Sequence, residues 1–252
     1  MVVEFPSILA PPILDSLAYL ILAVVAALLV YRIYQFRAGA AFIFNYIVMV
    51  YRSAIKLGLA KTLGIVISVV LKDFAGQTSS FESYRRQFTH LCIFWGFAGL
   101  AVTTTMDDIV NHAGLPLPLF SPVRLLGNVS GALLMVGLTI ALFRRLIYRE
   151  MRERTSGYDL LFFSLLCATA ITGFATEFAS MANAYVPTYI SYWAHIVLVC
   201  LLFVTAPLTK FVHSIKLPLL ILFYRLREAL IAKGELVPFQ PIGVLEQELL
   251  RR

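Results

Sequence analysis

Residues 85–104 read RRQFTHLCIFWGFAGLAVTT, and this stretch decides the fold. After the basic pair Arg85 and Arg86, the chain has no Lys, Arg, Asp or Glu before Asp107. An α-helix needs about 20 mostly apolar residues to cross the hydrocarbon core of a bilayer, because each residue rises about 1.5 Å. The stretch therefore predicts a transmembrane helix, and it places His90 within the membrane near one surface.

The rest of the chain has the same apolar character. Of its 252 residues, 60% are hydrophobic and 14% are charged, and the mean hydropathy is +0.84. A soluble domain has about 25% charged residues. The composition therefore predicts an all-α integral membrane bundle of about five transmembrane helices. The expected spans are about 13–33, 88–108, 123–146, 158–181 and 188–212.

The basic residues predict the orientation of this bundle. With five spans, every Lys and Arg except Arg124 falls on one side. Lys and Arg collect in cytoplasmic loops, so we expect the N-terminus outside and the C-terminus in the cytoplasm of a plasma-membrane protein. The isoelectric point of about 9.4 then reflects a basic face beside membrane lipids. No nucleic-acid partner is needed to explain it.

Two segments outside the spans have amphipathic patterns. In residues 34–87, the apolar runs are interrupted by Arg52, Lys56 and Lys61, which suits helices lying at the membrane interface. Residues 216–252 contain a second basic amphipathic stretch and form a possible docking element. We therefore expect a transmembrane domain over 1–215, including the interfacial segment 34–87, and a cytoplasmic tail over 216–252.

All four histidines lie in or beside the expected spans. An imidazole in hydrocarbon is costly unless its nitrogens are satisfied, so each is a functional candidate. His90 opens the second span and His213 closes the fifth on the same side, which suits two axial ligands of one haem. If the fifth span is one continuous helix, His195 lies five turns before His213 on the same face, about 27 Å away. That helix would then serve two haems, one near each surface.

The second ligand of an outer haem is less well defined. His112 follows the second span on the outer side and is the candidate, although an outer-loop histidine is often only solvated. A zinc site is the competing interpretation, but it needs three or four clustered His or Cys ligands. The cysteines Cys92, Cys167 and Cys200 lie singly in apolar runs and are expected to be packing residues.

Small residues and one proline also bear on a cofactor. Glycines in the second, third and fourth spans allow close helix packing, and they can equally make room for a porphyrin. These glycines are Gly96, Gly99, Gly127, Gly131 and Gly173. Pro207 lies between the two histidines of the fifth span, where we expect it to kink the helix.

Five segments resemble a known family, the membrane cytochrome b subunits of nitrate reductases, heterodisulfide reductases and related sulfite-reductase- and hydrogenase-associated complexes. They are VVLKDFAG at 69–76, HLCIFWGF at 90–97, PVRLLGNVSG at 122–131, TGFATEFA at 172–179, and YWAHIVLV with APLTKFVH within 192–213. The resemblance covers about 60–215. It implies a haem held by His90 and His213 nearer the cytoplasm, with His195 as a ligand of an outer haem.

One position departs from the family pattern. In nitrate-reductase members the other outer ligand is a histidine about ten residues after the one that matches His90, and this chain has Leu100 there. Leucine cannot bind iron. Either His112 takes this role or the chain holds one haem b instead of two. Two haems are favoured.

The resemblance further implies electron transfer between a membrane quinone or phenazine and a cytoplasmic iron–sulfur, heterodisulfide-reductase-like partner subunit. Oxidation of a quinol needs a proton acceptor beside the carrier. Glu177 is the best candidate, followed by Asp108 and Asp107. The alternatives are a haem-free membrane anchor for a soluble redox enzyme and a transporter whose histidines relay protons.

Overall fold

The computed structural model describes residues 11–34, 39–78, 83–112, 118, 120–153, 155–209 and 213–235. These ranges are helical apart from short connections and contain no strand, which confirms the all-α prediction. In chain order the elements are α1 (Pro11–Tyr34), α2 (Gly39–Lys56), α3 (Leu59–Ser68), the π-helix η1 (Val69–Ala75), α4 (Tyr84–His112), α5 (Pro122–Ile147), α6 (Arg149–Glu153), α7 (Gly157–Met181), α8 (Tyr185–Thr205), the 3-10 helix η3 (Ala206–Leu208) and α9 (His213–Ala232).

Four of these helical segments are long and apolar enough to cross a bilayer. They are Tyr84–Val110, Pro122–Ile147, Gly157–Met181 and Tyr185–Leu208. Their positions confirm the last four expected spans. The expected first span falls on α1, where the apolar stretch within the described residues is the shorter Ala18–Arg32. The total of five spans and the orientation of the termini remain predictions.

Two of the long helices begin at serine caps. Ser121 precedes Pro122 at the start of α5, and its hydroxyl accepts a hydrogen bond from the Arg124 backbone N–H. At α7, Ser156 and Asp159 form a reciprocal capping box. Such side chains satisfy backbone N–H groups that have no partner within the helix. These caps explain why both helices start where they do.

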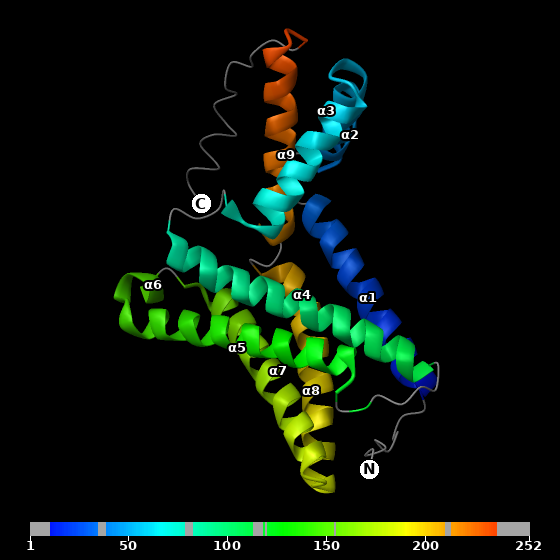
Figure 1. The fold of residues 1–252 in the computed structure, drawn as a ribbon, viewed down its shortest axis with the longest axis vertical. Helices are drawn as coiled ribbons and strands as arrows, with labels where there is room; N and C mark the ends of the chain where they lie inside the picture. Colours follow the sequence, from blue (N-terminus) through cyan, green and yellow to red (C-terminus); the bar gives the residue numbers. More distant parts are fainter. Residues whose placement is uncertain are drawn as a thin grey trace. The chain divides into compact units, whose positions relative to one another are not determined.

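Glycines bring α4 and α5 close together, and Figure 1 shows the two helices running side by side. A Cβ placed on Gly96 would lie 2.5 Å from the Leu134 backbone nitrogen, and one on Gly137 would lie 2.9 Å from that of Ile93. A Cβ on Gly99 would overlap the Ser130 hydroxyl. These glycines are therefore used for helix packing, one of the two roles that the sequence left open.

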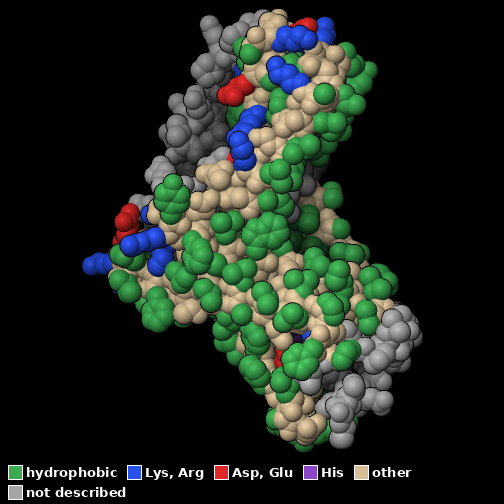
Figure 2. Space-filling view, in the orientation of Figure 1, with side chains coloured by type: hydrophobic (Ala, Val, Ile, Leu, Met, Phe, Trp, Pro, Cys, Tyr) green, Lys and Arg blue, Asp and Glu red, His purple; other side chains and the backbone are tan. Residues whose placement is uncertain are grey.

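A hydrophobic cluster joins α5, α7 and α8. Its buried members are Leu134, Leu138, Phe163, Leu166, Ala170 and Leu202, and Leu100 of α4 packs against them. Outside this cluster the bundle exposes many large apolar side chains. Figure 2 shows hydrophobic side chains spread over the visible face of the bundle, with charged residues gathered near the α5–α6 end. Such a surface suits contact with lipid.

The expected continuous helix from 188 to 212 was wrong at its C-terminal end. α8 ends at Thr205, a 3-10 turn follows over Ala206–Leu208, and His213 begins the separate helix α9. Pro207 lies in that turn, where it lacks an N–H and cannot continue an α-helix. The Arg32 guanidinium of α1 donates to the carbonyl oxygens of Pro207 and Leu208, both at 3.3 Å. His195 and His213 therefore do not share one helix.

Of the described residues, those in 34–76 and those after His213 form a compact unit distinct from the rest. Within it, Arg225 of α9 pairs with Asp73 of η1 at 3.0 Å and lies 3.4 Å from the Ser68 hydroxyl. The Asp73 side chain is completely buried. Because a buried carboxylate is unstable without a partner, this pair fixes α9 against η1.

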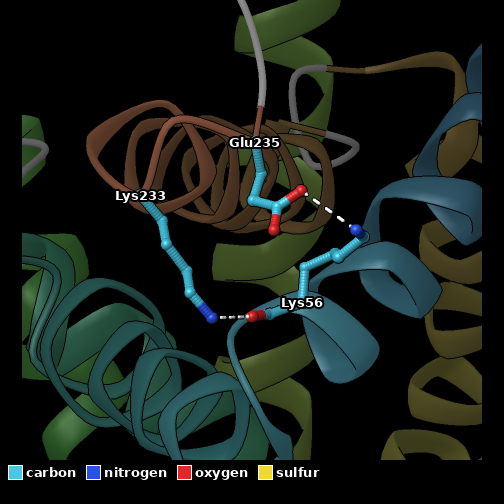
Figure 3. A network of polar contacts seen from close by, with 3 residues as sticks. All are labelled: Lys56, Lys233 and Glu235. Atoms are coloured by element: carbon cyan, nitrogen blue, oxygen red, sulfur yellow. Dashed lines mark hydrogen bonds and ion pairs between the residues drawn. The ribbon is translucent and has the colours of Figure 1, made fainter.

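Figure 3 shows a second set of contacts in the same unit. The Lys56 ammonium pairs with Glu235 at 3.1 Å, and Lys233 donates to the Lys56 carbonyl. The two expected interfacial stretches of 34–87 lie in α2 and in α3–η1, and the amphipathic stretch of the expected tail lies in α9. The structure thus groups the tail helix with the segment 34–76. A position at the membrane interface remains a prediction.

Candidate functional site

His195 of α8 is held by two groups of α7. Its Nδ1 lies 2.9 Å from the Thr169 carbonyl oxygen and 3.2 Å from the Thr172 hydroxyl. A carbonyl oxygen can only accept a hydrogen bond, so Nδ1 carries the proton and donates it to Thr169. The other nitrogen, Nε2, then presents a lone pair. Metal-binding histidines are commonly oriented in this way, with one ring N–H bonded to a backbone carbonyl.

Gly173 leaves space for the imidazole against α7. A Cβ at this position would lie 3.1 Å from His195 Cε1 and 3.4 Å from Nδ1. These separations are at or below the short end of carbon contacts, so a larger residue would press on the ring. The glycine predicted as either a packing or a porphyrin residue therefore determines how closely His195 approaches α7.

Thr169 differs from the other hydroxyl residues along this helix pair. Thr172 and Thr176 of α7 each donate to a backbone carbonyl one turn earlier, and Thr176 also contacts the Ser191 hydroxyl at 3.1 Å. Among the residues that the structure describes, the buried Thr169 hydroxyl oxygen has no hydrogen-bond partner. A buried polar atom beside an oriented histidine is the kind of feature that a bound polar or metal-containing group satisfies. The side chains around His195 therefore fit a haem ligand.

The other three histidines are less completely described. His90 is half-buried and lies in the second turn of α4. His213 is the first residue of α9 and His112 is the last residue of α4, and both side chains lie outside the described part of the chain. Pairing of His90 with His213, and of His195 with His112, therefore remains a prediction.

Glu177 of α7 is half-buried and has a partner on a neighbouring helix. The Asn128 side-chain amide of α5 donates to Glu177 Oε1 at 3.1 Å. Asp107 and Asp108 are exposed on α4. Of the three carboxylates proposed as proton acceptors, Glu177 is therefore the one that is both partly buried and held by another helix.

Asn128 was not among the residues selected from the sequence. It lies in the GNVSG segment of an apolar span, where a side-chain amide needs a partner for its hydrogen-bonding groups. That cost is the signal that would have identified it. Gly131, one turn further along α5, faces Phe174 of α7, whose ring would lie 2.8 Å from a Cβ on the glycine. The space at Gly131 is thus occupied by a phenylalanine ring.

Comparisons with known proteins agree with the motifs. The nitrate reductase gamma subunit family matches residues 88–193. A subunit of dihydromethanophenazine:CoB–CoM heterodisulfide reductase, from Methanosarcina barkeri, is 27% identical over 155 residues, which are 54% of this chain and 58% of that protein. The protein of the same name from Methanosarcina thermophila is 25% identical over 176 residues, covering 62% of this chain and 66% of that protein. No solved structure matches the chain significantly.

The chain thus spans less than two thirds of the length of these two relatives. Its family match covers α4 from Phe88 onward, all of α5 and α7, and the first part of α8 including Trp193. These are the helices that hold His90 and Glu177 and that carry the groups around His195. The matches confirm the resemblance drawn from the motifs: this chain is a multi-pass membrane protein similar to nitrate reductase gamma subunits and to a membrane-carrier-linked heterodisulfide reductase component.

Proposed function

We propose that this chain is the b-type cytochrome subunit of a membrane redox complex. In this proposal it passes electrons between a quinone or phenazine carrier in the membrane and a cytoplasmic iron–sulfur subunit of heterodisulfide-reductase type. His90 and His213 hold one haem b, and His195 is a ligand of a second, with His112 as its partner. A bound haem supplies an iron centre that accepts and releases single electrons.

The orientation of His195 is the observation that carries this proposal. The imidazole lies on a membrane-length helix, its Nδ1 is bonded to Thr169, and its Nε2 is left as a lone-pair donor. A histidine needed only for packing would place a polar ring in hydrocarbon without a functional reason. The names of the relatives, which refer to reduction of a heterodisulfide by a dihydrophenazine, support the same class of function.

The first test is haem content. The full chain is purified in detergent from cells supplied with a haem precursor, and its reduced-minus-oxidised optical spectrum is recorded. We expect b-type absorbance, and pyridine haemochrome analysis then gives one or two haems per chain. A preparation that is folded by circular dichroism but has no b-type absorbance would refute the proposal and leave the anchor or transporter functions.

Single histidine substitutions test the ligand assignment. H195A should remove one haem and leave the other if two are bound, because the two sites use different ligands. H90A should have the complementary effect on the haem shared with His213. The matched control is T105V, since Thr105 is an exposed residue of α4 whose hydroxyl bonds only to its own helix. Equal haem content in H195A and T105V would exclude His195 as a ligand.

The partner subunit is tested separately. The tagged chain is isolated from its own organism under mild detergent conditions, and the copurifying proteins are identified and assayed for iron and acid-labile sulfide. We expect an iron–sulfur protein in a fixed ratio to the chain. Isolation of the haem-loaded chain without one, after chemical crosslinking in intact membranes, would contradict that part of the proposal.

A further inference from the structure

We propose that Phe178, Glu177 and Asn128 form the binding site for the membrane carrier. The site takes a planar aromatic ring bearing an acidic O–H or N–H group, the chemistry that a quinol and a dihydrophenazine share. Phe178 stacks on the ring, Glu177 accepts its proton, and Asn128 positions the Glu177 carboxylate. This inference rests on the proposed function, because it names where the electron donor of that function binds.

Two contacts at adjacent turns fix the geometry between α5 and α7. Asn128 Nδ2 lies 3.1 Å from Glu177 Oε1. One turn away on each helix, the Phe174 ring lies in the space left by Gly131. The glycine allows the aromatic ring to lie against α5, and the two helices are then close enough for the short Asn128 side chain to reach Glu177. The pair is thus built into the helix packing.

The Glu177 carboxylate has one oxygen occupied and one available. Asn128 holds Oε1, and Oε2 has no hydrogen bond from the described residues. No Lys or Arg of the described part of the chain forms an ion pair with this carboxylate. A carboxylate on a membrane-length helix with a neutral amide as its partner is costly to keep permanently ionised, which is why such residues commonly exchange protons. Oε2 is therefore the oxygen placed to take a proton.

Phe178 supplies the apolar part of the site. It follows Glu177 directly, its side chain is 63% exposed on a membrane-length helix, and its ring stacks with that of Phe174 at a centroid distance of 6.0 Å and an interplanar angle of 20°. An aromatic face open to the surroundings of the helix is accessible to a lipophilic carrier that diffuses within the bilayer. Stacked aromatic pairs prefer offset geometry with centroids in the range seen here.

The proton step conserves atoms and electrons. The O–H or N–H bond of the reduced carrier breaks, and the proton forms a new O–H bond with Glu177 Oε2. Glu177 then releases that proton to water and can accept the second. The two electrons leave the carrier one at a time for ferric haem, which is the oxidant of the proposed function. The carrier is oxidised to a quinone or phenazine, and each ferric haem is reduced to the ferrous state.

Binding is measured first, with a probe that does not require haem. A fluorescent hydroxyquinoline N-oxide, which mimics a quinol, is titrated with the full-length protein in detergent, and quenching gives Kd. F178A should weaken binding by about 3- to 10-fold, the range for loss of one aromatic pair. F178W should restore it. F143A is the matched control, because Phe143 is also a 57% exposed phenylalanine but lies four turns from Asn128 on α5.

Haem reduction is measured second, by stopped-flow absorbance with duroquinol in one arm and a reduced hydroxyphenazine in the other. E177Q should lower the maximal rate by about 100-fold or more, the usual scale for loss of a general base, and leave the half-saturating concentration within about 2-fold. N128L should lower the maximal rate by about 10-fold, since the carboxylate remains but is no longer held. N128Q, which keeps the amide donor, should recover part of that loss.

The outcomes separate this inference from the function on which it rests. Absence of b-type haem refutes the proposed function, whereas probe binding can still be measured on the haem-free protein. If haem is present and E177Q is reduced by both carriers at the wild-type rate, Glu177 is not the acceptor. If F178A binds the probe as tightly as F143A does, the ring lies elsewhere. Either result overturns the inference.

Discussion

Replacement of Gly173 by valine should displace His195 and weaken haem binding. The Cβ alone would lie 3.1 Å from Cε1 of the imidazole, and the two methyl groups of valine extend about 1.5 Å beyond Cβ. The ring must therefore move away from α7, and the 2.9 Å hydrogen bond from Nδ1 to the Thr169 carbonyl is lost. Loss of a neutral hydrogen bond costs about 1 kcal/mol. Loss of a group that orients a metal-binding histidine lowers metal affinity by about 10- to 100-fold.

The assay compares haem affinity with folding in the same preparations. Haem transfer to an excess of apomyoglobin measures the dissociation rate from G173V, G173A and the wild type, and circular dichroism monitors helix content. G64A is the control, because a Cβ on Gly64 meets nothing within 4 Å. G173A should show a smaller effect than G173V. If G173V keeps its haem at the wild-type rate while H195A loses one, the contact between Gly173 and His195 does not control ligation.

The remaining predictions concern the fold, and each is read from thermal or denaturant unfolding in detergent. D73A should destabilise the unit formed by α2, α3, η1 and α9 by about 3 kcal/mol, the lower end for a broken buried pair because Arg225 is 37% exposed, whereas the double variant D73L/R225M should recover much of the loss. G99V should destabilise the α4–α5 pair by about 1–3 kcal/mol through overpacking against Ser130; G157A, with nothing within 4 Å, is its control, and equal stability would contradict the packing. S156A removes the cap of α7 and should cost about 1 kcal/mol; S156N should restore it, and no difference from the wild type would exclude the cap.

The spans were predictable because each is a run of apolar residues long enough to cross a bilayer. The second span, for example, is bounded by Arg86 and Asp107, and the structure extends α4 by only a few residues on either side. Charge and turn residues mark such boundaries directly in the sequence. The apolar pattern does not say how helices pair, and so the contacts of Gly96 and Gly99 with α5 could be anticipated only as possibilities.

The end of α8 shows where periodicity misled the prediction. The spacing of His195 and His213 fits five turns of a helix, but a periodic spacing has meaning only if the backbone is continuous. Pro207 was expected to kink the helix, and in the structure the α-helix stops before it. The freed carbonyl groups of Pro207 and Leu208 are satisfied by Arg32, which is far away in the sequence. No local pattern indicates that contact, which is why a kink and a break could not be distinguished.

The candidate site was predicted only in part. Glu177 and His195 were selected because ionisable and polar groups are rare in membrane helices. Their partners, Asn128 and the Thr169 carbonyl, lie on other helices, and one of them is a backbone atom. A backbone acceptor has no signature in the amino-acid sequence. Residues that carry chemistry can therefore be recognised from the chain alone, but the groups that orient them require the arrangement of the helices.

The ion pair between Asp73 and Arg225 has a consequence for biosynthesis. Ser68 and Arg225, which contact each other beside this pair, are 157 residues apart, so the ribosome makes the acidic partner well before the basic one. During that interval the α2–α3–η1 segment contains an acidic group without its cation, and it cannot close around that group at low energy. Completion of this unit must wait until α9 has been synthesised. A chain that stops before Arg225 would keep this segment open, in a form that membrane proteases can recognise as unfinished.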